Sequence, residues 1–255
     1  MKEKLHFNVF ILLMTLAITQ GLFSQSQQAI NVSYLKKADK FIDTTGTKKA
    51  NSTISQINAL VLKDVETLVY ELSINEFYSV FKERKSLTLK PDSDAIRKLA
   101  SSYGGTDGTF YINKRDSSYL QLKEFSGNQF KIKTKAKNWQ IHSKEFKYID
   151  KYRCVKATTV DTVVNPKGVF KFDVVAWFCP ELPSFFGPAG YFGLAGLILE
   201  LQNGKISLLA KEIDFEPANI PTFDISRKKG ALVTQREFDS IVEKTAKDFF
   251  RISKF

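Results

Sequence analysis

The sequence predicts a mainly β protein of the α+β kind, in which a curved antiparallel sheet or partial barrel has a C-terminal helix packed on it. Three observations support this fold class. Short strand candidates follow one another from residue 68 to residue 215 with almost no helix between them. Turn signals such as Asn203-Gly204 separate several of these candidates. Apolar side chains then recur at helical spacing near the C-terminus.

The strand candidates are short and closely spaced. The first two, residues 68–74 and 77–81, alternate apolar and polar side chains and predict a hairpin. The others are residues 109–113, 119–125, 129–135, 139–143, 152–164, 169–179, 197–202 and 205–215. Strands this close together pair most simply as antiparallel neighbours.

The turn at Asn203-Gly204 predicts a specific register. A two-residue loop there places Leu201 opposite Ile206 and Leu199 opposite Leu208. The hairpin would therefore have one apolar face.

Two helices are expected. Residues 91–102 can form a short helix that ends at Gly104-Gly105. The helix predicted for residues 234–252 has clearer signals, because Thr234 and Glu237 form a capping box and Val233 and Phe238 occupy the positions of a hydrophobic staple. We expect this helix to cover part of the sheet.

The first 24 residues have the pattern of a signal peptide. Lys2 and Lys4 precede the apolar residues 9–18, and Ser24 is a small residue suited to cleavage. We therefore expect residues 1–24 to be removed, residues 25–53 to form a polar N-terminal arm, and residues 54–255 to form a single β-rich domain. The expected location is the periplasm, the outer envelope or the surrounding medium. Because residues 1–24 contain no cysteine, a lipid anchor is not expected.

Export makes a disulfide between Cys154 and Cys179 chemically accessible. The two cysteines face each other if residues 165–168 close a two-residue hairpin loop. If Gly168 forms a bulge, the register slips by one residue and they do not face each other. The sequence leaves both alternatives open and favours the bonded pair.

The formal net charge of +11 favours anionic partners such as acidic polysaccharide, lipid headgroups or an acidic protein surface. Nucleic acid is not expected, because the compartment is wrong and no recognition motif is present. Lysines at a two-residue period form a basic stripe: Lys131, Lys133, Lys135 and Lys137. The stripe is either a surface for an anionic ligand or, as we favour, the protection of an edge strand against further pairing.

Residues 182–199 form the longest uncharged run after the signal peptide. Two prolines and four glycines make it a poor membrane-spanning helix, so it is expected inside the domain. Aromatic residues gather around it, and most of them should be core. The remainder define a candidate groove or contact patch, whose residues are Trp177, Phe185, Phe186, Tyr191, Phe192, Gly193, Leu194, Ala195, Gly196, Leu197 and Glu200.

No catalytic constellation is visible in the sequence. After signal removal His142 is the only histidine, and no nucleophile motif or set of companion metal ligands accompanies it. Asp214 and Glu216 can share one strand face, which is interpreted as a solvated face opposite a buried Phe215. No catalytic residue, metal or cofactor is therefore predicted.

Several short motifs together resemble the GLPGLI family of exported Bacteroidetes proteins. The matching residues are YRCVKA at 152–157, VAWF at 175–178, PELP at 180–183, GP at 187–188 and GLAGLILE at 193–200. The resemblance extends over residues 68–250. One departure is Ala195, which replaces the central proline of the motif and implies a less rigid turn. In the matched motifs Glu200 either binds Lys156 or is an ordinary exposed strand acid, which we favour.

The resemblance implies a β-rich exported protein that works beside outer-membrane receptor and transport systems, with no established activity. We therefore expect a non-enzymatic envelope or periplasmic binding or accessory protein. Its partner would be an outer-membrane receptor or transport protein, or an apolar or anionic envelope ligand. The alternative is a hydrolase of envelope polymers that uses Asp214, Glu216 or Glu200 as its acids.

Overall fold

The computed structural model describes residues 29–39, 52–85, 94–165, 168–182, 184–204, 206–218 and 223–252. The predicted signal peptide lies outside these residues. The strands described are β1 (Ile30–Ala38), β2 (Val69–Ile74), β3 (Tyr78–Glu83), β4 (Thr109–Asn113), β5 (Ser118–Phe125), β6 (Asn128–Lys133), β7 (Gln140–Ile149), β8 (Tyr152–Asn165), β9 (Gly168–Cys179), β10 (Leu197–Asn203), β11 (Ile206–Asp214) and β12 (Ala231–Thr234). The helices described are α2 (Ser52–Val65), α3 (Asp94–Ser102), the short 3₁₀ helix η2 (Pro188–Gly190) and α4 (Gln235–Ile252).

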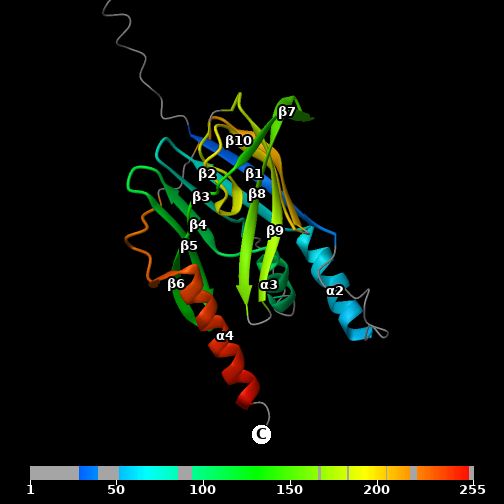
Figure 1. Ribbon diagram of the computed structural model, residues 1–255, viewed down its shortest axis with the longest axis vertical. Helices are drawn as coiled ribbons and strands as arrows, with labels where there is room; N and C mark the ends of the chain where they lie inside the picture. The colour runs from blue at the N-terminus through cyan, green and yellow to red at the C-terminus, as the bar shows by residue number, and fades with distance from the viewer. Residues whose placement is uncertain are drawn as a thin grey trace, which may run out of the picture.

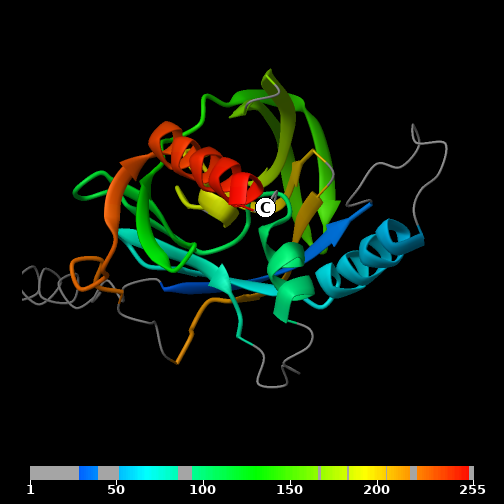
Figure 2. The same ribbon diagram turned by 90° about the horizontal axis from the view of Figure 1, so that it is seen from below.

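The described strands form one sheet in the order β12-β6-β5-β4-β3-β2-β1-β11-β10-β9-β8-β7. Neighbouring strands are antiparallel, except that β12 runs parallel to β6. The sheet is strongly curved (Figure 1), and seen from below it bends round η2 while α4 crosses the opening (Figure 2). The predicted fold class is confirmed: a curved, mainly antiparallel sheet with a C-terminal helix on it.

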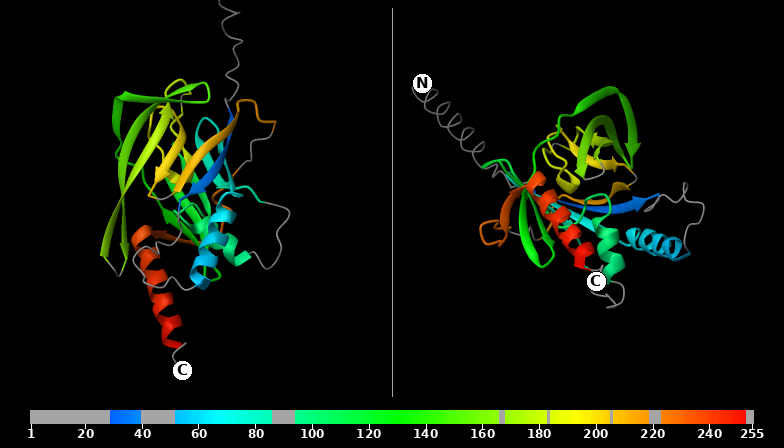
Figure 3. Two further views of the ribbon diagram at one scale, coloured as in Figure 1. Left: turned by 90° about the vertical axis from the view of Figure 1, so that its right-hand side faces the viewer. Right: turned by 60° about the horizontal axis from the view of Figure 1, so that its bottom comes forward.

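The α-helices of the described residues, α2, α3 and α4, gather at one end of the curved sheet, as Figure 3 shows from two sides. We call this end the mouth. None of the helices in the described part of the chain is long and apolar enough to cross a membrane. The mouth is thus the end of the sheet at which α2, α3 and α4 lie.

The expected polar arm is wrong for Ile30–Ala38. These residues form β1, which lies in the middle of the sheet between β2 and β11. Val32 and Tyr34 are fully buried, and the Tyr34 hydroxyl donates a hydrogen bond of 2.6 Å to the carbonyl oxygen of Ile198. The local polarity of this stretch misled the prediction, because tertiary pairing supplies the partners that its sequence alone does not reveal.

The β10–β11 hairpin exists, but its predicted register is wrong. Leu201 pairs with Leu208 rather than Ile206, and Asn203 pairs with Ile206. Asn203 ends β10 instead of entering the turn, and Gly204 takes the left-handed conformation with φ of 61°. Because the shift is two residues, the apolar side chains stay on the same faces.

The β8–β9 hairpin follows the two-residue alternative. Asn165 pairs with Gly168, and the register continues without a bulge to Val155 opposite Phe178. One further step brings Cys154 opposite Cys179. Both cysteines are buried free thiols in the structure, and burial raises the pKa of the Cys154 thiol to about 12. The disulfide itself stays a prediction.

The C-terminal helix begins as its sequence predicts. The backbone N–H of Thr234 donates to Glu237 Oε2 over 2.7 Å, and the N–H of Glu237 donates to Thr234 Oγ1 over 3.2 Å. Phe238 is buried against Phe130 and Ile132 of β6, with Val233 packed beside them. The capping box and the staple therefore dock the first turns of α4 onto the sheet near the mouth.

Candidate functional site

The uncharged run around residues 182–199 lies mostly in the core. Most of its predicted contact residues are buried, namely Phe186, Tyr191, Phe192, Leu194, Gly196 and Leu197. Trp177, Phe185 and Glu200 are half-buried, and Gly193 and Ala195 are exposed. The expectation of sheltered interior is confirmed, because the described residues of this run are mainly buried side chains.

The close packing of this run explains its glycines. A Cβ atom on Gly196 would lie 2.4 Å from the carbonyl oxygen of Cys179, and one on Gly187 would lie 2.4 Å from that of Tyr191. Both contacts are with backbone, which cannot move aside cheaply. The run is therefore shaped for tight packing against β9, and this packing holds Tyr191 in a fixed place.

A cavity of about 1190 Å³ lies at the mouth. It lies between the part of the curved sheet that contains β4, β5 and β6 and the part that contains β8 and β9. Its walls come from β4, β5, β6, β8 and β9, from η2, from the turns after α3 and β10, and from the start of α4. Among the described residues, four lysines and two aspartates are the charged side chains that line it: Lys123, Lys133, Lys135, Lys137, Asp161 and Asp239. The cavity is thus the concave region in which residues distant in sequence come together.

One wall of the cavity is a polar network centred on Asp161 of β8. The Lys137 ammonium donates to Asp161 Oδ1, and the Tyr191 hydroxyl donates to Asp161 Oδ2. The side-chain amide of Asn203 donates to the Tyr191 oxygen over 2.6 Å. Burial, together with the charge of Asp161, raises the pKa of the Tyr191 phenol far above its ordinary value, so the phenol keeps its proton. This network fixes four separate segments around the cavity.

The predicted basic stripe is divided by the structure. Only Lys131 and Lys133 lie in β6, whereas Lys135 and Lys137 lie in the connection to β7. The favoured role as a protected edge strand is wrong, because β6 lies between β5 and β12. Three of the lysines, Lys133, Lys135 and Lys137, line the cavity.

The two exposed lysines of the stripe differ from the other lysines of the cavity. Lys137 is paired with Asp161, and Lys123 lies 2.8 Å from Asp107. Lys133 and Lys135 are exposed, and no salt bridge joins either of them to a carboxylate within the described residues. Hydrogen bonds from Thr234 and, to a smaller extent, the charge of Lys133 lower the pKa of Glu237 at the start of α4, so Lys133 has an acid nearby although the two form no salt bridge. Lys135 forms no salt bridge within the described residues.

An apolar wall faces the same space from the β8–β9 hairpin. Phe172 pairs with Asp161, and Phe170 pairs with Val163. Cross-strand partners share a face, so these residues continue the inner face that carries the buried Val174 farther up the strand. Phe172 and Val163 line the cavity. Their exposed fractions of 40% and 46% leave them available for contact.

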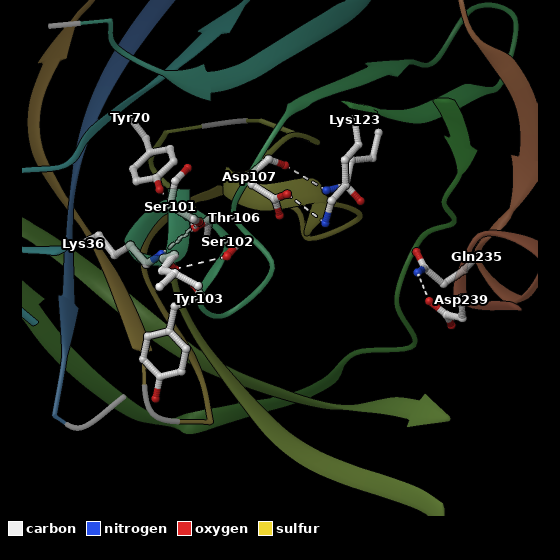
Figure 4. Close-up of polar contacts among 12 residues, drawn as sticks. Lys36, Tyr70, Ser101, Ser102, Tyr103, Thr106, Asp107, Lys123, Gln235 and Asp239 are labelled. Carbon is white, nitrogen blue, oxygen red and sulfur yellow. Dashed lines mark hydrogen bonds and ion pairs between the residues drawn. The ribbon is translucent and has the colours of Figure 1, made fainter. Parts of the chain in front are cut away.

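A buried ammonium group lies beside the cavity, as Figure 4 shows. Lys36 Nζ donates to the carbonyl oxygens of Ala100 and Tyr103 over 2.7 and 2.5 Å, and to Thr106 Oγ1 over 2.7 Å. These carbonyls end helix α3 and its following turn, so the lysine caps that helix. Burial lowers the pKa of Lys36 to about 7, although the charges of Asp107 and Glu83 partly oppose this effect.

Lys36 does not line the cavity but binds the turn after α3, which does. The turn it holds contributes Tyr103 and Gly104 to the cavity lining. In Figure 4 the Lys123–Asp107 pair lies next to this turn, and Gln235 and Asp239 of α4 lie across from it.

The acids proposed for hydrolysis do not come together. Glu200 accepts from Lys147 Nζ over 2.7 Å, whereas Lys156, its predicted partner, binds Glu145. Glu200 pairs with Leu209 of β11, so it lies five residues, or about 17 Å, along the sheet from Asp214.

The other predicted acids are on the surface. Asp214 and Glu216 are exposed and share a local hydrogen bond, and Phe215 is 44% exposed instead of buried, because β11 has already ended. His142 contacts Thr158 and Glu145 on the outer strands. No group of three metal-ligating side chains occurs within the described residues.

Most of the cavity residues had no signal in the sequence. Tyr191 stood out in the aromatic cluster and Lys137 in the basic stripe, but Lys123, Asp161 and Asn203 look like ordinary strand residues. Only their spatial convergence gives them a role. The chain is thus a curved-sheet protein with a cavity that has both a basic and an apolar wall.

Comparison with known proteins adds a family match to a short part of the chain. A family model described as a protein of unknown function, Porph_ging, matches residues 166–200. This segment contains β9, the glycine-rich run and the start of β10. No curated protein matches the sequence.

Solved structures with a similar outline are distant. PNGF-II in its P21 crystal form is 13% identical with a TM-score of 0.46, and the match covers 84% of this chain and 32% of that one. In the C2 form the identity is 14%, the TM-score is 0.46, and the shares are 86% and 32%. LprF from Mycobacterium bovis is 10% identical with a TM-score of 0.28, covering 78% of this chain and 90% of that one. The chain spans about a third of the length of PNGF-II.

Proposed function

We propose that this chain is a non-enzymatic binding or accessory protein of the GLPGLI type, exported to the periplasm or outer envelope, whose ligand occupies the cavity at the mouth. The observation that carries the proposal is the cavity itself. Its volume of about 1190 Å³ lies just above the usual range for small-molecule sites. A site of this size accommodates a ligand larger than a typical metabolite.

The arrangement of the walls supports binding in this place rather than at the glycine-rich run. Hydrogen bonds between side chains of separate segments hold Asp161, Tyr191 and Asn203 in position before any ligand arrives. Because these walls are already ordered, the protein loses less conformational entropy when a ligand binds. The glycine-rich run then serves as the scaffold that presents Tyr191, which is consistent with the family signal extending over residues 166–200.

The sequence resemblance supports the GLPGLI assignment and the export. The residues that carry this resemblance are mainly glycine, proline and apolar types, and the structure places most of them in the core. A partner protein in the outer membrane is compatible with this proposal, because the cavity accounts for a ligand and leaves the outer strands free for other contacts.

The test uses the mature chain, residues 25–255, and small molecules extracted from the envelope of its own host. We expect native mass spectrometry to show an added mass after exposure to the extract, and the melting temperature to rise. Val163→Trp, which places a large side chain on the inner face of the hairpin, should abolish both effects.

The matched control is Lys171→Trp on the same hairpin. Lys171 precedes Phe172 on β9, so its side chain lies on the opposite face from Phe172 and Val163, and Lys171 is not among the residues that line the cavity. This variant should bind like the wild type. The proposal fails if the extract adds no mass and no stability to the wild-type chain, or if both tryptophan variants bind equally well.

A further inference from the structure

We infer that the ligand of the cavity is an anionic amphiphile, a molecule with an acidic head group and an apolar chain. The inference rests on the proposed function, since it names the ligand class for the same cavity. It follows from the fact that the basic and the apolar residues of the cavity come from different elements and form different walls.

The lysines that line the cavity, which form its basic wall, indicate that the ligand carries an anionic group. Lys123 and Lys137 already have carboxylate partners, but Lys133 and Lys135 are exposed and form no salt bridge with a carboxylate of the described residues. Within the described part of the lining, lysines outnumber aspartates by four to two. Ammonium groups next to a low-dielectric wall attract a carboxylate or phosphate more strongly than they would in open water.

The exposed apolar side chains of the hairpin indicate that the ligand also has an apolar hydrocarbon part. Val163, Phe170 and Phe172 are adjacent on the inner face of the hairpin and are each at least 40% exposed. Three neighbouring large apolar side chains on a concave face are a contiguous patch rather than scattered surface residues. Helix α4 also contacts β8, but its half-buried Ile241 and Val242 pack against the cluster of Phe130, Ile132 and Phe238, so the apolar wall consists of the hairpin residues.

The two walls together favour an amphiphile over simpler ligands. A neutral apolar molecule would leave Lys135 without an anionic partner at the edge of the site, and would leave Lys133 with only the exposed carboxylate of Glu237 nearby. A hydrophilic anion such as an acidic sugar would leave the exposed Val163 and Phe172 in contact with water or with its hydroxyl groups. A ligand with an acidic head group and an apolar chain can pair with the lysines and cover the apolar side chains at the same time.

The experiment measures binding of a homologous series to the mature chain by isothermal titration calorimetry below the critical micelle concentration. The probes are alkyl carboxylates and alkyl phosphates of 8 to 12 carbons, the matching alkyl alcohols, and inorganic phosphate. Burial of each methylene contributes up to about a fourfold increase in affinity, so affinity should rise steadily with chain length. The comparison of carboxylate with phosphate identifies the preferred head group.

The head-group lysines are tested by the double variant Lys133→Met and Lys135→Met. Both side chains are exposed, so the fold should be retained. We expect the anionic probes to lose at least tenfold in affinity and to bind no better than the alcohols, while binding of the alcohols is unchanged. The control is Lys144→Met, an exposed lysine of β7 outside the cavity, which should leave all affinities unchanged.

The outcomes separate this inference from the proposed function. If alcohols bind the wild type as tightly as the anions, or if inorganic phosphate binds and chain length has no effect, the ligand class is wrong, although a cavity ligand remains. If the envelope extract also yields no bound molecule, the proposed function fails as well. An affinity that rises with chain length and depends on Lys133 and Lys135 supports the inference.

Discussion

Lys36 has a fully buried side chain in a central strand, and its protonation should affect stability. Its ammonium group is surrounded by carbonyl oxygens at the end of α3. Because burial lowers its pKa to about 7 in the folded state, the folded chain binds fewer protons than the unfolded chain between pH 7 and the ordinary lysine value near pH 10. The free energy of unfolding should therefore rise with pH in this window.

The prediction is tested with urea denaturation at pH 7, 8 and 9. The expected slope from this one group is at most about 1.4 kcal/mol per pH unit. Buried cysteines change stability in the opposite direction near the top of the window, so the comparison is with Lys36→Met, which lacks the titrating group but keeps the side-chain length. Equal slopes in the wild type and the variant would contradict the assignment.

Gly196 should not tolerate a side chain. A Cβ atom at this position would lie 2.4 Å from the oxygen and 2.7 Å from the carbon of the Cys179 carbonyl. Gly196→Ala forces apart β9 and the glycine-rich run, and overpacking of this kind typically costs about 1–3 kcal/mol. Thermal unfolding should show a lower melting temperature, while Ala195→Ser at the exposed neighbouring position should have little effect.

The cysteine pair provides a further test at single residues. Continuous register brings Cys154 opposite Cys179, and export would place both in an oxidising compartment. We expect protein isolated from the envelope to carry no titratable thiols until it is reduced. Mass spectrometry of peptides under non-reducing conditions checks this, and two thiols that react after unfolding without reductant would exclude the bond.

Among the side chains described for α4, those of residues 235–248, Phe238 is the one deeply buried anchor. Phe238 is 4% exposed and contacts Phe125 and Phe130 through edge-on ring pairs at 5.9 and 5.2 Å, whereas residues 239–248 are half-buried or exposed. Phe238→Ala should remove about 3–5 kcal/mol of packing energy from this small cluster. The helix should then detach locally while the sheet persists.

Hydrogen exchange measures this effect directly. Amides of α4 should lose protection in Phe238→Ala, and amides of β1 and β10 should keep it. An exposed position on the same helix, Lys244→Ala, is the matched control. Loss of protection throughout the molecule would show that α4 is integral to the whole sheet.

Elements that are specified by local sequence signals could be predicted, whereas elements that depend on distant contacts could not. The hairpins and α4 were predictable, because turn residues, alternation and capping boxes are local. β1 was not, because two lysines make it look like surface, and Lys36 is buried only where α3 offers its carbonyl groups. The site was missed for the same reason: Lys123, Asp161 and Asn203 acquire a shared role only through the curvature of the sheet.

For the whole molecule, the two ends of the chain contribute unequally to the sheet. β1 pairs with both β2 and β11, whereas β12 pairs only with β6 at the border of the sheet. A chain that begins at residue 52 should therefore expose two unpaired strand edges and aggregate. A chain that ends at residue 230 loses β12 and α4 and should keep the central strands.

Size-exclusion chromatography and circular dichroism of the two truncated chains check this difference. The N-terminal deletion should give the larger loss of structure, although it removes no more of the described sheet than one strand. Equal behaviour of the two chains would mean that the position of β1 matters less than its pairing suggests.

If the chain is exported as proposed, the location of β1 between β2 and β11 also sets the order in which its strands can pair. A polypeptide that is threaded through a translocation pore from its N-terminus releases Ile30–Ala38 early and Ile206–Asp214 late. Throughout that interval the seam between these strands stays open, because one of its two sides has not yet arrived. On that route the chain would remain compatible with passage in an extended form until most of its length is across, and β1 and β11 would pair only on the far side.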